Sequence, residues 1–372
     1  MVPVYLAGDN ITSPLGISTK GNFGKVKDGF SAIRQISDAN LSPEPFYAAM
    51  FENLAAGDKF TRFEKICIAS IEDALLQTTV TFSSPDTLFI LSTTKGNIEL
   101  IEGKEVNEEI RSRVSLFNTA ELITEHFGSE NKPLVVSNAC ISGVLSVIIA
   151  KRLLESGKYK HAVITGADVL SRFVISGFQS LNAMSKKPCK PFDKHRDGIN
   201  LGECAATMIL TTDKSLSKNI LISGGASTND ANHISGPSRT GMELAYAVNS
   251  AMHESKVSAT DLSFISAHGT ATLFNDEMEA KAFSCSSFSD VPLHSLKGHF
   301  GHTLGAAGVL ESVITCHSLL GSIVLPSKNF ETSGVSEEIN VSQELIKSNR
   351  NHALKTASGF GGCNAAIIYS HT

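Results

Sequence analysis

Short apolar runs alternate with longer stretches of helical periodicity along most of the chain. The apolar runs have the length of strands and lie at residues 86–93, 133–138, 161–168, 206–212, 219–228, 263–269, 292–297 and 365–370. Apolar positions three and four residues apart predict helices at residues 63–77, 142–156, 241–255, 275–284 and 303–321. Strands that alternate with helices favour an α/β protein with a mostly parallel sheet.

The alternating pattern of strands and helices occurs twice along the chain. Each half carries strands, helices and closing strands, and the break falls near residues 213–219. There is no literal sequence repeat, so duplication is a hypothesis at this level. We expect residues 1–215 and 216–372 to form two similar halves.

Composition narrows the class of protein. Of the 372 residues, 42% are hydrophobic and 19% are charged, which is typical of a globular chain with a large core. The net charge of −5 provides no basic field for binding nucleic acid. No apolar stretch approaches the ~20 residues that span a bilayer, so we expect no membrane span. The first residues, MVPVYLAGDN, lack the pattern of a signal peptide, which predicts a cytoplasmic location.

Cysteine usage agrees with that location. Seven cysteines stand at the scattered positions 67, 140, 189, 204, 285, 316 and 363. An odd number without a CxxC pair predicts reduced thiols, not a disulfide framework. No group of cysteine and histidine has the spacing of zinc ligands, so we expect no metal site.

Cys140 lies where a strand pattern changes into a helix pattern, in VVSNACISGVLSVIIAKRLLESGK at residues 135–158. Unpaired N–H groups and the positive end of a helix dipole at that point favour thiolate over thiol. Most free cysteines, however, are small buried residues. Taken alone, this stretch leaves a nucleophile and a packing residue both open.

Histidines and glycines mark further candidate positions. His268 ends an apolar strand in FISAHGTAT, and His299 and His302 lie among glycines in SLKGHFGHTLGAAG. Open α/β sheets build their sites at such strand ends. The glycines of ASGFGGCNAAII indicate either a tight turn or a mobile loop whose amides face an oxyanion. The irregular, lysine-rich stretch 179–200 predicts a surface loop.

Five motifs together carry a resemblance to a known family. NACISG, PFDKHRDGINLGE, HGTATLFNDEMEA, LKGHFGHTLGAAG and SGFGGCN stand in this order from residue 135 to the C-terminus, and SPLG at 13–16 adds a weaker match. In this order they resemble the β-ketoacyl-acyl-carrier-protein synthases, the condensing enzymes of fatty acid and polyketide synthesis. The resemblance implies a thiolase-like α/β fold, in which each half has a mixed, mostly parallel sheet covered by helices in αβαβα layers.

The same resemblance implies an activity and its central residues. Cys140 would take an acyl group from acyl carrier protein, and a malonyl thioester would then lose carbon dioxide and attack it. His268 and His302 would stabilise the resulting enolate, whereas His299 matches no family histidine. The amides of Cys140 and Phe360 would form an oxyanion hole, and Phe360 would move as a gate.

Supporting residues follow from the same matching. The resemblance implies that Lys297 is a catalytic residue that acts through its charge and takes no part in the covalent step. It implies a supporting role for Glu279 beside the histidines. Substrate binding is implied for four residues, the first three at positions that hydrogen-bond the pantetheine arm: Thr270, Thr272, Ser235 and Gly361. The expected docking site for the acidic carrier protein consists of Lys59, Arg62, Lys65, Lys186 and Lys187. No cofactor of the chain's own is implied, and the expected assembly is a homodimer or a heterodimer with a related subunit.

Several positions depart from the family pattern. Cys363 stands where threonine or serine is usual, Cys204 and Ala205 replace a glycine-rich pair, and Lys95 puts a charge in a segment that often lines the acyl pocket. These departures favour an aryl polyene or other polyketide-like pathway over ordinary fatty acid elongation. Two other readings stay open. One is a thiolase that uses Cys363 as acid and base, and the other is a chain length factor, although such subunits usually lack the cysteine.

Overall fold

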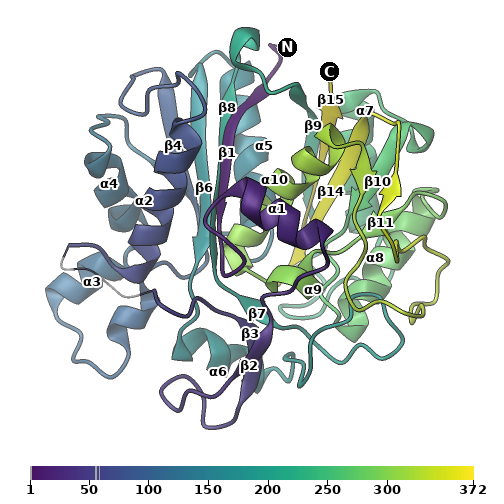
Figure 1. Cartoon of the computed structure of the whole chain (residues 1–372), viewed down its shortest axis with the longest axis horizontal. Helices are drawn as coiled ribbons and strands as arrows, with labels where there is room; N and C mark the ends of the chain where they lie inside the picture. Colours follow the sequence, from purple (N-terminus) through teal and green to yellow (C-terminus); the bar gives the residue numbers. More distant parts are fainter. Residues whose placement is uncertain (1, 55–56, 58) are drawn as a thin grey trace.

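Ten strands form one mixed sheet that runs through the molecule (Figure 1). The computed structural model describes residues 2–54, 57 and 59–372. The strand order is β11-β10-β14-β15-β9-β1-β8-β6-β4-β5. The strands are β1 (Tyr5–Thr12), β4 (Thr87–Ser92), β5 (Leu134–Val136), β6 (His161–Asp168), β8 (Cys204–Thr211), β9 (Ile220–Asn229), β10 (Leu262–Ser266), β11 (Leu293–His294), β14 (His352–Gly359) and β15 (Cys363–His371).

The sheet repeats one pairing pattern in its two halves. In the first half, β5, β4 and β6 are parallel neighbours, and β8 and β1 continue antiparallel. In the second half, β11, β10 and β14 are parallel neighbours, and β15 and β9 continue antiparallel. One residue pair, Tyr5 with Leu221, joins the halves between β1 and β9. This repeat supports the duplication hypothesis, while a division into two domains at residues 215 and 216 stays a prediction.

Helices lie on both outer faces and between the halves (Figure 1). They are α1 (Thr19–Lys27), α2 (Arg62–Leu75), α3 (Glu108–Val114), α4 (Leu116–His126), α5 (Ser142–Glu155), α6 (Arg172–Ser180), α7 (Met242–Ser255), α8 (Leu273–Cys285), α9 (Lys297–Phe300) and α10 (Ala307–Leu320). Helix α2 packs on β1 and β8, α7 packs on β9 and β15, and α5 and α10 contact strands of both halves. The result is the expected αβαβα layering of a thiolase-like fold.

Two glycines allow the central helices α5 and α10 to meet at backbone contact. A Cβ atom added to Gly143 would lie 2.6 Å from the nitrogen of Val309, and one added to Gly308 would lie 2.3 Å from the nitrogen of Val144. Because real Cβ atoms do not approach backbone this closely, larger side chains would force the helices apart. The contact fixes the position of α5, and Cys140 lies directly before that helix.

Short elements complete the described part of the chain. They are β2 (Arg34–Ile36), β3 (Phe46–Ala49), β7 (Leu201–Gly202), β12 (Ile323–Val324) and β13 (Ile346–Lys347). Within the described ranges, no helix has both the length and the apolar character needed to cross a bilayer.

The structure differs from the sequence expectations in several elements, among them the helices α1, α3, α4 and α6, which were not predicted. Strands β1 and β14 were not predicted, because their buried positions include polar residues such as Asp9 and Lys355. The chain from residue 295 onward leaves β11 and turns into α9 instead of extending the strand to residue 297. The stretch 179–200 is not a simple surface loop, because Phe192 and Asp193 within it are fully buried.

Candidate active site

The nucleophile candidate sits in a tight turn between β5 and α5. Ala139 has φ of 45°, a conformation that a residue with a side chain rarely adopts. The Asn138 N–H donates to Ser142 Oγ (2.7 Å), and that hydroxyl donates to the Ala139 carbonyl (2.6 Å). No side chain caps the start of α5. This turn places Cys140 with only 9% of its surface exposed, at the wall of a cavity.

The two histidines reach the same point from the second half of the chain. His268 follows β10, and its backbone N–H donates to Glu279 Oε1 (2.8 Å). The backbone N–H of His302 donates to the backbone carbonyl of Asn200 (2.7 Å), which belongs to the stretch before β7. The two rings meet edge to face with centroids 5.2 Å apart. Cys140 Sγ and one nitrogen of each ring all lie within 4.8 Å of one another.

Cysteine and histidine are also the ligands that zinc prefers, and this trio is the one such group among the described residues. The three residues come from separate segments, so spacing along the sequence did not reveal the group. A zinc site also needs a further ligand, which the open cavity leaves to solvent or substrate. The trio therefore has the donor types for a metal and equally the residue types for nucleophilic catalysis.

The cavity measures about 480 Å³ and opens from Cys140 to the surface. Its walls include three of the four predicted substrate residues, Thr270, Thr272 and Ser235, and also Phe360, which was predicted as a catalytic residue. Thr270 and Thr272 share a hydrogen bond between their hydroxyls (2.8 Å). Gly361 is not among the wall residues, and its backbone N–H donates to the Ile234 carbonyl (2.7 Å), so its role in substrate binding stays a prediction.

Burial sets the protonation states in the site. It raises the pKa of the Cys140 thiol to about 12, and the neighbouring Cys363 adds to this, while Lys297 opposes it. The sequence argument for a thiolate at the helix start therefore does not hold in this structure, because desolvation outweighs the favourable charges. Burial, with the positive charge of Lys297, also holds the pKa of both His268 and His302 well below the ordinary range. The resting site thus contains a thiol and two neutral imidazoles.

The ring nitrogens are largely unoccupied by protein partners. Both nitrogens of His302 and the Nδ1 atom of His268 are buried without a hydrogen-bond partner in the structure. Buried polar atoms in proteins are almost always paired. Both histidines line the cavity and each has a ring nitrogen within 4.8 Å of Cys140 Sγ, so the rings are placed to bind a ligand that enters it.

Lys297 lies behind the histidines and not on the cavity wall. Its side chain is fully buried, it forms an ion pair with Glu311, and its Nζ donates to the His268 carbonyl (3.1 Å). Glu279 accepts the N–H groups of both His268 and Gly269. Both predicted supporting residues therefore hold the His268 turn. His299 points away from the site and pairs with the Phe30 carbonyl (2.6 Å).

The Phe360 loop reaches over the thiol. A Cβ atom at Gly359 would lie 2.9 Å from the Cys140 nitrogen, so only glycine permits this approach of β14. The Phe360 N–H is directed at the Cys140 sulfur and favours its ionised form. The Phe360 ring is partly exposed and stacks on Phe178 of α6, with centroids 5.9 Å apart. The sequence analysis did not identify Phe178 or Asn200, whose roles depend on contacts distant in the chain.

The predicted docking residues fall into two groups. Lys186 and Lys187 are exposed on the stretch that also supplies Asn182 and Ala183 to the cavity wall. Arg62 is instead engaged within the chain, in ion pairs with Glu99 (3.1 Å) and the buried Glu203 (2.9 Å).

The other two docking candidates flank the start of α2. Lys59 is exposed, with its ammonium over the Phe60 ring at 4.9 Å. Lys65 lies within the first turn of α2.

Comparisons with known proteins agree with this geometry. Residues 90–215 match the model of the β-ketoacyl synthase N-terminal domain, and residues 220–331 match that of the C-terminal domain. A putative polyketide β-ketoacyl synthase 1 from Streptomyces cyaneus is 25% identical, over 98% of this chain and 97% of that protein. The 3-oxoacyl-[acyl-carrier-protein] synthase 2 of Vibrio harveyi is 30% identical, over 65% of this chain and 62% of that protein.

Solved structures show the same fold. A β-ketoacyl synthase from Burkholderia phymatum STM815 superposes with a TM-score of 0.92 and 23% identity, covering 100% of both chains. The ketosynthase ApeO from Xenorhabdus doucetiae, solved with its chain length factor ApeC, gives a TM-score of 0.89 and 22% identity over 100% of this chain and 98% of that one. With the two domain matches and the convergence of Cys140, His268 and His302, these findings show that the chain belongs to the β-ketoacyl synthases, condensing enzymes of the acyltransferase class.

Proposed function

We propose that the chain joins an acyl group carried on Cys140 to a malonyl group carried on acyl carrier protein, with loss of carbon dioxide. The observation that carries this proposal is the convergence of one buried thiol and two neutral imidazoles on a single cavity. The substrates arrive on the phosphopantetheine arm of the carrier protein, so the reaction needs no cofactor resident in the chain.

In the first step Cys140 Sγ attacks the thioester carbonyl of the acyl donor. The bond from sulfur to the acyl carbon forms, the bond to the pantetheine sulfur breaks, and the thiol proton ends on the departing pantetheine thiolate. Burial disfavours an isolated thiolate, but moving the proton to a nearby imidazole creates a pair without net charge. Each histidine has a ring nitrogen within 4.8 Å of the sulfur for this transfer.

In the second step the malonyl group loses carbon dioxide and its electron pair becomes an enolate. Neutral imidazoles of His268 and His302 each carry one N–H, which stabilises the negative charge on the thioester oxygen. The enolate carbon attacks the Cys140 thioester, the carbon–sulfur bond breaks, and the Cys140 thiolate takes up a proton. Decarboxylation supplies the carbanion, so no base is required to remove a proton from carbon.

The amides of Cys140 and Phe360 are our candidates for the oxyanion hole. The Phe360 N–H already faces the sulfur, which supports this role. The Phe360 ring lines the same cavity as Cys140 and rests on Phe178, so it lies where an acyl group on the sulfur has to pass. We propose that the Phe360 loop is the gate of the cavity.

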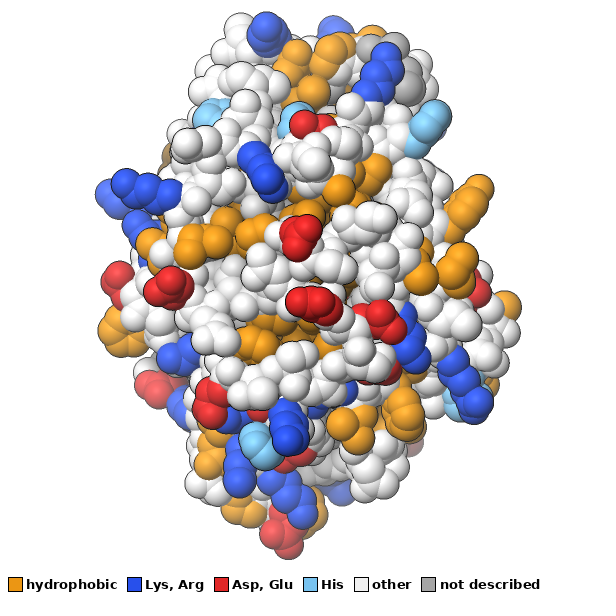
Figure 2. Space-filling view, turned by 90° about the vertical axis from the view of Figure 1, so that its right-hand side faces the viewer, with side chains coloured by type: hydrophobic (Ala, Val, Ile, Leu, Met, Phe, Trp, Pro, Cys, Tyr) orange, Lys and Arg blue, Asp and Glu red, His pale blue; other side chains and the backbone are white. Residues whose placement is uncertain are grey.

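Carrier-protein docking is proposed at the cavity mouth. Lys186 and Lys187 are the strongest candidates, because they are exposed next to residues of the wall, whereas the ion pairs of Arg62 remove it from the proposed site. The pantetheine arm would pass Thr270, Thr272 and Ser235. On the face shown in Figure 2, basic and acidic side chains are interspersed, so charge alone does not mark a docking site there.

We propose a dimeric assembly, either a homodimer or a heterodimer with a related subunit. ApeO was solved with a chain length factor, and a similar structure was solved as a complex of a type II polyketide ketosynthase with its acyl carrier protein. The presence of Cys140 supports the catalytic role for this chain and not the role of a chain length factor. We further propose a cytoplasmic location, which the seven unpaired cysteines support.

The thiolase alternative finds less support. A thiolase needs a second cysteine at the reacting carbon, and Cys363 is the candidate. Cys363 neighbours Cys140 but is not among the residues of the cavity wall; its Sγ lies 3.4 Å from the Phe360 carbonyl, and burial raises its pKa to about 11. The pathway is left to experiment, between fatty acid elongation and the polyene or polyketide-like role that Lys95 and Cys363 favour.

Intact-mass analysis tests the proposal. The protein is incubated with carrier proteins that bear different acyl groups, and then with malonyl-acyl carrier protein. We expect a mass increase that maps to Cys140, followed by a carrier-bound product two carbons longer. The donor that loads best identifies the pathway. An adduct on another residue, or a chain elongated without an adduct, would contradict the proposed mechanism.

A further inference from the structure

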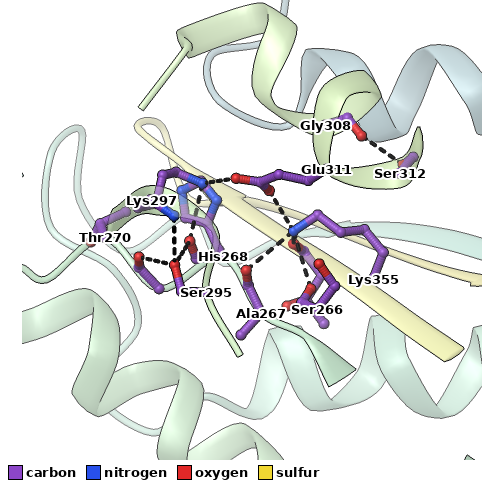
Figure 3. A network of polar contacts seen from close by, with 12 residues as sticks. Ser266, Ala267, His268, Thr270, Ser295, Lys297, Gly308, Glu311, Ser312 and Lys355 are labelled. Carbon is purple, nitrogen blue, oxygen red and sulfur yellow. Dashed lines mark hydrogen bonds and ion pairs between the residues drawn. The ribbon is translucent and has the colours of Figure 1, made fainter. Parts of the chain in front are cut away.

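A second lysine is buried behind the two histidines. Lys355 of β14 is fully buried, and its Nζ lies 2.6 Å from Glu311 Oε2 in an ion pair. The same ammonium lies within 3.2 Å of the carbonyls of Ser266, Ala267 and Thr356. Figure 3 shows Glu311 between the two lysines, with Lys297 on one side and Lys355 on the other.

These contacts converge on the backbone of His268. Lys355 binds the carbonyl of Ala267, the residue directly before it, while Lys297 binds the carbonyl of His268 itself. Glu279 accepts the His268 N–H (2.8 Å). Three buried charges therefore hold two successive peptide groups, and a loss of any one frees the turn that aims the imidazole.

The charges around Lys355 also act on the imidazoles. Glu311 of α10, Glu279 of α8 and Lys297 of α9 face it, and so do the rings of His268, His302 and His294. The two lysines and two glutamates balance in charge. Both lysines still lower the pKa of His268 and His302, so the rings stay neutral and can donate an N–H.

We propose that Lys355 is a positioning residue for the decarboxylation step, fixing the peptide before His268 and placing a second positive charge beside both imidazoles. The proposal rests on the proposed function, because it concerns the step that the imidazoles perform. It assigns no contact between Lys355 and substrate, since the side chain lies behind the histidine and outside the cavity wall.

The matched control is Lys151→Met. Lys151 of α5 is equally buried and forms two ion pairs, with Glu155 (2.5 Å) and Glu254 (2.7 Å). Lys355→Met and Lys355→Gln each remove the charge at the proposed position, and Gln retains a hydrogen-bond donor. The protein is assayed as the oligomer that it forms, with acyl loading of Cys140 and carbon dioxide release from malonyl-acyl carrier protein measured separately.

We expect the Lys355 variants to slow carbon dioxide release about 100-fold, because a small misplacement of a catalytic group has effects of this size. Acyl loading and the KM for malonyl-acyl carrier protein should change little. The acid limb of the pH profile for carbon dioxide release should move to higher pH, because loss of a positive charge raises the pKa of the imidazoles. Lys355→Gln should retain more activity than Lys355→Met, and Lys151→Met should match the wild type in both assays.

Several results would overturn the proposal. These are an equal loss of loading and carbon dioxide release, an unmoved pH profile, or failure of both Lys355 variants to fold while Lys151→Met folds, which would make the role of Lys355 structural. The proposed function fails separately: wild-type protein that neither loads Cys140 nor releases carbon dioxide contradicts it, and this proposal with it.

Discussion

The two halves of the sheet share one topology but supply different chemistry. Cys140 lies in the connection from β5 to α5, and His302 lies in the equivalent connection from β11 to α10. Gly143 of α5 and Gly308 of α10 form the contact between these two helices. Three residues after each glycine, α5 has the neutral Ser146 and α10 has the charged Glu311. In the first half the residues of the thiol turn, 138–142, are uncharged and Lys95 makes a minor contribution, whereas the second half places buried charges directly behind its imidazoles.

This difference follows from what each group must do. Burial without a strong countercharge raises the pKa of Cys140 to about 12 and keeps an unused thiol protonated. Burial, together with the ammonium groups behind the rings, holds the pKa of His268 and His302 low and keeps the imidazoles neutral, so that they can accept the thiol proton and still donate an N–H. Two halves of the same topology therefore form one active site, in which the first half supplies the nucleophile and the second half supplies the imidazoles that stabilise the enolate.

Removing the nucleophile of the first half should have the largest effect on condensation. Cys140→Ala should reduce condensation about 10⁴-fold or more, since no acyl-enzyme can form. The measurement is formation of the elongated carrier-bound product by mass spectrometry. Cys285→Ala, at an exposed cysteine, is the control and should condense normally. Retained elongation by the Cys140 variant would exclude covalent catalysis through this residue.

Removing a histidine should damage only the second task. We expect His268→Ala or His302→Ala to slow condensation about 10²–10³-fold, the usual effect of deleting one hydrogen-bond donor to a developing oxyanion. Loading of Cys140 should be less affected, because the remaining imidazole can still take the thiol proton. His299→Ala is the control outside the site. Normal condensation by both variants would show that the enolate is stabilised elsewhere.

Separating the central helices should weaken both halves at once. Gly308→Ala places a methyl group 2.3 Å from the Val144 nitrogen, and overpacking of this kind costs about 1–3 kcal/mol. Gly177→Ala in α6 is the control, because nothing lies within 4 Å of the added methyl. Urea unfolding measures both free energies. Equal stability of the two variants would mean that the helix contact adapts freely.

Alkylation tests whether the Cys140 thiol is protonated in the free protein. With a pKa of about 12, the rate of Cys140 modification by iodoacetamide should rise about tenfold per pH unit from pH 7 to pH 10. The rate is followed by peptide mass spectrometry in the wild-type protein, with Cys285 as the internal reference. A rate that levels off near pH 8 or below would indicate a thiol activated before substrate binds.

The sequence predicted the reacting residues of the site better than the buried charges that hold them in place. Apolar runs located β4, β6, β8, β9 and α5 closely, since these elements bury apolar faces. The motifs identified Cys140, His268 and His302, which the structure brings together. Family matching thus supplied the reacting groups, because they occupy fixed places in short motifs.

The buried charges could not be predicted in the same way. Lys355 interrupts an apolar pattern, and its partners in β10 and α10 lie more than 40 residues away along the chain, so β14 was overlooked. The pKa of Cys140 was misjudged, because the helix start is visible in the sequence whereas the depth of burial is not. The ion pairs of Arg62 with Glu99 and Glu203 could not be predicted either, because these partners lie 37 and 141 residues away along the chain, and a docking role for Arg62 stays a prediction.

The most direct test of the divided site is carbon dioxide release from malonyl-acyl carrier protein by the Cys140→Ala protein, measured beside acyl loading by the His302→Ala protein. The account predicts that the cysteine variant still decarboxylates malonyl while it loads nothing, and that the histidine variant loads Cys140 while decarboxylation falls about 10²–10³-fold. Loss of both activities in either variant would contradict the division of the reaction between the two halves.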